Sequence, residues 1–96
     1  MADSTLRLSE LRNGLIPALE AEIEMTKVKH AERLSVLERA NEMRQQRISS
    51  NTAVPQTIYD AIMANIYMST MYEQDILRKS DQLKVLHDEI HRLMNP

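Results

Sequence analysis

The chain has 96 residues, 27% of them charged and of mixed sign, and its formal net charge is −2 at pH 7. This near-neutral balance gives no general attraction to nucleic acid or to an anionic membrane. With no Cys and a single Gly, the chain cannot build disulfides, thiolate metal sites or a glycine-rich phosphate loop.

One Gly and three Pro also leave little turn chemistry for a sheet, so we expect one all-α domain spanning residues 1–96. No run of 18 apolar residues occurs, and we expect no membrane span. Residues 1–12 lack the continuous apolar core of a secretory signal. The expected location is therefore the cytoplasm.

The first predicted element is a short helix over residues 4–13. Gly14 suits the left-handed position just after a helix, and Pro17 suits the first turn of the next helix. These two residues predict a break between them. A continuous helix with a kink at Pro17 is the alternative, and the sequence leaves it open.

The second predicted element is a long helix over residues 17–47, followed by a loop over 48–55 that is rich in Ser, Thr, Asn and Pro. Its apolar residues form two weak stripes, the first interrupted near Thr26 and His30. The first stripe is Leu15, Ile16, Leu19, Ile23, Leu34 and Leu37, and the second is Met25, Val28, Val36, Ala40 and Met43. Two stripes predict contacts on two sides of this helix.

The third predicted element is a helix over residues 56–93. Thr57 and Asp60 have the spacing of a capping box, and a start at Pro55, two residues earlier, is the alternative. One row of residues recurs along this helix at alternating steps of three and four, which is typical of a coiled-coil seam. The row is Ile58, Ile62, Asn65, Ser69, Tyr72, Ile76, Lys79, Leu83, Leu86, Ile90 and Leu93. We expect this seam to pack antiparallel on the second helix, with paired residue numbers summing to about 104.

The first half of the third helix is apolar on nearly every face, and we take it as the candidate partner-binding segment. It contains all three tyrosines of the chain. The predicted binding residues are Tyr59, Met63, Ile66, Tyr67, Met68, Met71 and Tyr72. One neighbouring helix covers only one face of such a segment. Two interpretations stay open: a groove for a foreign amphipathic helix, or the core of a homodimeric four-helix bundle.

No constellation predicts catalysis or a bound metal, cofactor or small-molecule substrate. His87 and His91 are one helical turn apart, as metal-binding imidazoles often are, but a third ligand is missing and both flank the seam. Arg39, Arg44 and Arg47 alternate with glutamates and have no aromatic neighbours for base stacking, so a hairpin that binds nucleic acid is the weakest of the alternative functions.

The layout resembles the small chaperones of bacterial type III secretion. The resemblance rests on the break at Gly14 and Pro17, the loop from Ser49 to Pro55 and the two long helices around them. It covers the whole chain and contains no diagnostic motif. It implies a non-enzymatic chaperone or adaptor that shields an amphipathic helix of a secretion-system client. A coiled-coil subunit that assembles with copies of itself, as needle and rod components do, is the alternative.

Overall fold

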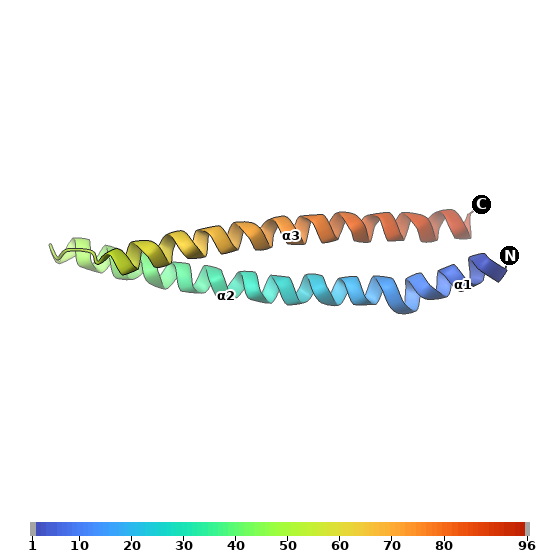
Figure 1. Cartoon of the computed structure of the whole chain (residues 1–96), viewed down its shortest axis with the longest axis horizontal. Coiled ribbons are helices and arrows are strands. Elements are labelled where there is room, and N and C mark those ends of the chain that lie inside the picture. Colours follow the sequence, from blue (N-terminus) through green and yellow to red (C-terminus); the bar gives the residue numbers. More distant parts are fainter. Residues whose placement is uncertain (1, 96) are drawn as a thin grey trace. The chain divides into compact units, whose positions relative to one another are not determined.

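The described part of the computed structural model, residues 2–95, consists of helices and one short loop. Helix α1 spans Ala2–Glu10, a π-helical turn η1 spans Leu11–Leu15, α2 spans Ile16–Ser49 and α3 spans Gln56–Met94 (Figure 1). No strand occurs among these residues. The predicted all-α class is confirmed.

The chain divides into two compact units, and the long helices contribute to both. Unit 1 joins the residues up to Thr26 with those from Asp75 onward. Unit 2 comprises Lys27–Gln74 and is a helical hairpin made of the second part of α2, the loop and the first part of α3. In unit 2, His30 contacts Glu73, so the paired numbers sum to 103, against the expected value of about 104.

The predicted break at Gly14 and Pro17 is a π-helical turn, and the helical backbone continues through it. The N–H of Ile16 donates to the carbonyl of Leu11, five residues earlier. Gly14 does not have a positive φ, so the expected left-handed cap is wrong, and the continuous helix is the alternative that the structure adopts. An α-turn would press the Pro17 ring against the carbonyl of Asn13, and the wider turn immediately before the proline relieves this contact.

The π-helical turn also keeps the buried face of unit 1 continuous. Leu11 and Ile16 are 0% and 6% exposed although they are five residues apart. In an α-helix this spacing would rotate the second side chain about 140° away from the first. The extra residue in η1 therefore lets both side chains enter the same core.

Helix α2 ends in a Schellman motif, with Asn51 at the left-handed position (φ 58°). The N–H of Asn51 donates to the carbonyl of Ile48 at 3.1 Å, and the N–H of Thr52 donates to that of Arg47 at 2.8 Å. These are the paired bonds of this cap. The loop consequently begins at residue 50, two residues later than predicted.

Helix α3 begins at Gln56, so Thr57 lies inside its first turn and is not a cap. The Asp60 carboxylate accepts a bond from the Gln56 amide at 3.0 Å, and the predicted capping box is not formed. The carbonyl of Pro55 accepts the first helical bond, from the N–H of Ile58, at 3.0 Å.

Every residue of the row predicted as the seam of α3 is buried or half-buried. The partner row on α2 differs from the two predicted stripes, because polar residues replace apolar ones within a single seam. Its buried and half-buried members are Ile16, Leu19, Ile23, Thr26, His30, Arg33, Leu37, Ala40 and Arg44. Leu15 and Leu34, which were expected in the first stripe, are 44% and 43% exposed. The predicted interruption at Thr26 and His30 is thus part of the packing face.

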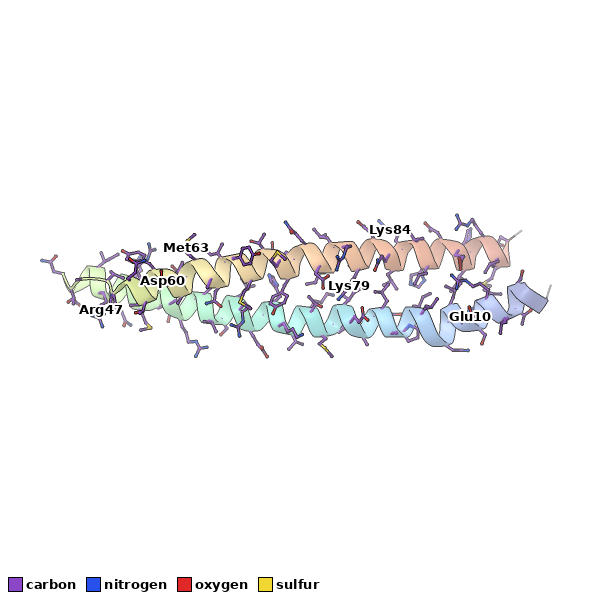
Figure 2. All side chains as sticks on the ribbon, viewed as in Figure 1. Glu10, Arg47, Asp60, Met63, Lys79 and Lys84 are labelled. Atoms are coloured by element: carbon purple, nitrogen blue, oxygen red, sulfur yellow. The ribbon has the colours of Figure 1, made fainter. Side chains whose placement is uncertain are left out.

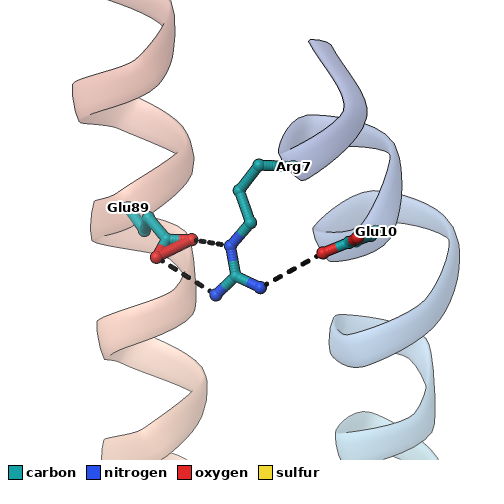
Figure 3. A network of polar contacts seen from close by, with 3 residues as sticks. All are labelled: Arg7, Glu10 and Glu89. Atoms are coloured by element: carbon teal, nitrogen blue, oxygen red, sulfur yellow. Dashed lines mark hydrogen bonds and ion pairs between the residues drawn. The ribbon is translucent and has the colours of Figure 1, made fainter. Parts of the chain in front are cut away.

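An ion network ties α1 to the end of α3 within unit 1 (Figure 3). The Arg7 guanidinium donates to both carboxylate oxygens of Glu89, at 2.6 and 3.2 Å, and lies 3.4 Å from Glu10. The hydrogen bond from Arg7 is the largest influence on the Glu89 carboxyl and lowers its pKa below the ordinary value. In the same unit, the Lys79 ammonium nitrogen lies 2.9 Å from a carboxylate oxygen of Asp75 and 3.8 Å from one of Glu22.

Leu11→Ala tests the π-helical turn. The side chain is fully buried, so its removal should lower the free energy of unfolding by about 2–4 kcal/mol. Leu15→Ala, four residues away and exposed, is the matched control and should cost less than about 1 kcal/mol. Urea unfolding of both variants measures the difference. Equal losses would contradict the inward placement of Leu11.

Glu89→Gln tests the ion network through its pH dependence. Because the pKa of Glu89 is lowered in the folded state, its stabilising contribution is present above the ordinary glutamate pKa of about 4.3 and is lost as pH falls through the lowered value. Glu89→Gln should therefore be less stable than the native chain at pH 7, with the difference shrinking toward pH 3. Urea unfolding across this range measures it. A stability difference between Glu89→Gln and the native chain that stays constant from pH 7 to pH 3 would contradict the ion pair.

Candidate protein-binding surface

The predicted binding residues fall into two groups by exposure. Tyr59, Met63, Ile66, Tyr67 and Met71 are exposed, and Met68 and Tyr72 are half-buried. Met63 and Tyr67 expose 65% and 67% of their surface, and Met63 points away from α2 (Figure 2). The seam uses one face of α3 only, so the other apolar side chains of this segment are left at the surface.

One flank of the seam in unit 2 carries large apolar side chains from both helices, and we name it the Ile66 side. It consists of Leu34, Asn41 and Ile48 on α2 and Tyr59, Ile66 and Glu73 on α3, each set spaced by seven residues. The His30 imidazole lies 3.2 Å from the Glu73 carboxylate. Because His30 is one helical turn before Leu34, this contact places both rows on the same flank.

A hollow of about 670 Å³ lies on the α2 part of this flank. Leu34 and Leu37 give it an apolar floor, and polar residues surround them. The full lining is Leu34, Leu37, Glu38, Asn41, Glu42, Gln45 and Gln46. An apolar floor with a polar rim is the usual composition of a protein-binding patch.

The opposite flank of unit 2 is rich in methionine, and we name it the Met68 side. It consists of Val36 and Met43 on α2 and Met68 and Met71 on α3. Met43 and Met71 are 51% and 49% exposed. Methionine is flexible and polarisable, so such a surface adapts to partners of varied shape.

The seam between these two flanks contains buried polar atoms without hydrogen-bond partners. The Asn65 amide donates to the Ala61 carbonyl at 2.7 Å, but its Oδ1, the Ser69 hydroxyl and Arg44 Nε are buried with no partner among the described residues. Each such group costs free energy that an apolar side chain would not. The pairing of α2 and α3 in unit 2 is therefore weaker than its length implies.

Several of these surface residues were missed in the sequence. Leu34 was expected inside the hairpin, and Ile48 was assigned to the loop. Both could be placed only after the register between the helices was known. In unit 1, a second groove of about 460 Å³ was also unforeseen. It is lined by Leu15, Ala18, Leu19, Glu22, Gln82, Val85 and Leu86.

The two histidines considered as metal ligands lie at the surface of α3. His87 and His91 are both exposed on α3 in unit 1. Among residues 2–95, no group of three or more His, Cys, Asp or Glu side chains has an arrangement that could hold a metal ion. No described helix is both long and apolar enough to cross a membrane.

Ser69→Ala tests the unsatisfied seam. The substitution removes a buried hydroxyl that has no partner, so the free energy of unfolding should rise. Ser80→Ala, an exposed site on the same helix, reports the gain in helix propensity alone, about 0.5 kcal/mol. We expect Ser69→Ala to exceed this control by about 1 kcal/mol in thermal or urea unfolding. A loss of stability would show that the Ser69 hydroxyl is bonded in solution.

Comparisons of the chain with protein-family models, curated proteins and solved structures find no match. The function is therefore inferred from the exposed side chains of unit 2 and from the groups that surround them.

Proposed function

We propose that the chain is a non-enzymatic helical interaction protein, a small cytoplasmic chaperone or adaptor that shields an amphipathic helix of a client. A client from a secretion-type assembly fits the resemblance of the helix–loop–helix layout to type III secretion chaperones. The observation that carries the proposal is the exposure of large apolar side chains on the surface of unit 2, above all Met63, Tyr67 and Met71. Such side chains are typical of surfaces that become covered in a complex.

The Met68 side is the better receptor for a foreign helix. Met43 on α2 and Met68 and Met71 on α3 lie on a flank where two antiparallel helices run side by side. An amphipathic helix can place its apolar residues between two such helices. Methionine side chains repack around different partners at little cost. Tyr72 lies one helical turn after Met68 and is half-buried in the seam next to this flank.

Self-assembly is the second candidate function, and the polar seam favours it. A hairpin whose own seam holds unpartnered Asn65 and Ser69 atoms gains more from additional helices than a fully satisfied hairpin does. A coiled-coil subunit that builds a larger complex would use the same apolar flanks. Homodimerisation is compatible with both functions, since a dimer can also be the form that receives a client.

The experiment co-expresses the tagged chain with each of the proteins encoded beside it and purifies any complex. A chaperone or adaptor should yield one defined complex with a single client. A structural subunit should yield higher oligomers of the chain itself. A chain that purifies without any client in every combination, and forms no higher oligomer, would contradict both functions.

Met43→Ala with Met71→Ala tests the client site in that complex. Both side chains are about half exposed and lie off the seam, so folding should be retained while client affinity falls by more than about tenfold. Titration calorimetry with the purified client measures the affinity, and circular dichroism checks the helicity. Leu77→Ala, at an apolar residue of α3 in unit 1 that is 66% exposed, is the control and should bind normally. Unchanged binding by the double variant would remove the Met68 side as the client site.

A further inference from the structure

We infer that the Ile66 side of unit 2 is covered by a second copy of this chain, packed antiparallel about a twofold axis through Ile66, while the Met68 side stays open. This inference rests on the proposed function and specifies one of its partners. It is carried by four observations: the area that the chain exposes, the symmetry of the residues on α3, an arginine without a counter-charge, and a hollow on α2.

The exposed area leaves room for an additional interface. The chain exposes 7110 Å², whereas a folded monomer of 11.1 kDa typically exposes about 5,700 Å². The excess is about 1,400 Å² per chain. A stable dimer buries about 800 Å² on each partner, so one additional interface fits within the excess and leaves area for a client.

The residues of α3 around Ile66 match those of a second α3 helix that runs in the opposite direction. Tyr59 and Glu73 lie seven residues before and after Ile66. In an antiparallel pair of α3 helices centred on Ile66, each Tyr59 faces the partner's Glu73 and the two Ile66 side chains meet. The Tyr59 hydroxyl can then donate to that carboxylate. Such reciprocal pairing is what a twofold interface requires.

The register within unit 2 gives the partner's Glu73 a second bond. Glu73 contacts His30 of its own chain. Tyr59 is fourteen residues before Glu73, and Arg44 is fourteen residues after His30, so Tyr59 and Arg44 lie at the same height along the hairpin. Arg44 has no ion pair among the described residues, and its Nε is buried without an acceptor. The twofold axis brings the partner's Glu73 to the level of Tyr59 and therefore supplies Arg44 with a carboxylate.

The hollow on α2 fits the same axis. By the register of the His30–Glu73 contact, the level of Ile66 on α2 is that of Leu37, which lines the hollow together with Leu34. The second copy would fill this hollow with apolar side chains at the centre of the interface. The charged residues there, Glu38 and Glu42, lie at its rim, where they remain in water.

Disulfide trapping tests the axis, because the chain has no cysteine of its own. Ile66→Cys places one thiol on the twofold axis, within reach of its copy. Mild oxidation should convert most of this variant to a covalent dimer of twice 11.1 kDa on a non-reducing gel. Met71→Cys, at a similarly exposed residue on the Met68 side, is the control and should stay monomeric on that gel. Equal trapping of both variants, or trapping of Met71→Cys alone, would overturn the inference.

Analytical ultracentrifugation of the unmodified chain at micromolar concentration gives the second readout, and a monomer there would overturn the inference directly. Glu73→Lys places a cation opposite the partner's Arg44 and should raise the dimer dissociation constant at least tenfold. Glu32→Lys makes the same charge change at an exposed residue of α2 away from the Ile66 side and should leave it unchanged. A twofold or smaller effect of Glu73→Lys would overturn the Glu73–Arg44 contact.

Client titration on Glu73→Lys separates this inference from the proposed function. If the variant is monomeric and still binds the client, both the Ile66-side dimer and the Met68-side client site stand. A monomeric native chain that binds a client would end the dimer alone, and a trapped dimer that binds none would end the client function alone.

Discussion

The constraint on which the rest of the structure depends is that two helices cover only one face of each other. Each long helix meets the other along one row of residues at steps of three and four, and everything off that row is left to solvent or to another protein. In the second half of α3 the residues off the row are mostly polar or charged, with Leu77, Val85 and Met94 as the exposed apolar exceptions. In the first half of α3 the residues off the row include Tyr59, Met63, Tyr67 and Met71, so the same geometry leaves an apolar surface exposed to solvent.

The chemistry of the seam reinforces this division between the units. In unit 1 the packing face includes the fully buried Leu11, with Ile16 and Ile23 nearly so, and an arginine–carboxylate network holds the terminal helix in place. In unit 2 the corresponding positions include Asn65 and Ser69 with unpaired atoms. Unit 1 is held by apolar packing and ion pairs, whereas unit 2 carries more of the exposed large apolar side chains, a division that is common between a scaffold and a binding region.

The helices were predictable from the sequence because their signals are local. Pro55 marks the start of α3, the cluster from Ser49 to Asn51 marks the end of α2, and the spacing from Ile58 to Leu93 marks the packing face. The π-helical turn was not predictable in this way. Gly14 and Pro17 usually punctuate helices, and only the burial of both Leu11 and Ile16 shows why the helix continues. The seam of α2 is not visible as an apolar periodicity in the sequence, because Thr26 and His30 occupy two of its positions.

The candidate site was half predictable for a related reason. The apolar character of residues 59–72 is visible in composition alone, and all seven chosen residues lie exposed or half-buried on α3. Its division into an Ile66 side and a Met68 side depends on which residues of α2 stand next to which residues of α3. That register is a property of two segments together, and the loop and the His30–Glu73 contact set it.

The five-residue step from Leu11 to Ile16 has a consequence for how the chain tolerates changes in length. A π-helical turn is an α-helix with one residue inserted, and the insertion here sits where no neighbouring atom lies within 4 Å of a Cβ added to Gly14. Deleting one residue within η1 would bring Leu11 and Ile16 to the ordinary four-residue step and keep both side chains in the core, but the restored α-turn would press the proline ring against the preceding turn of the helix. A deletion within α2 between Ile23 and Ala40 would instead rotate every later side chain out of the seam. A change of length should therefore be tolerated better at η1 and in the loop after Ser49 than in the helix between them.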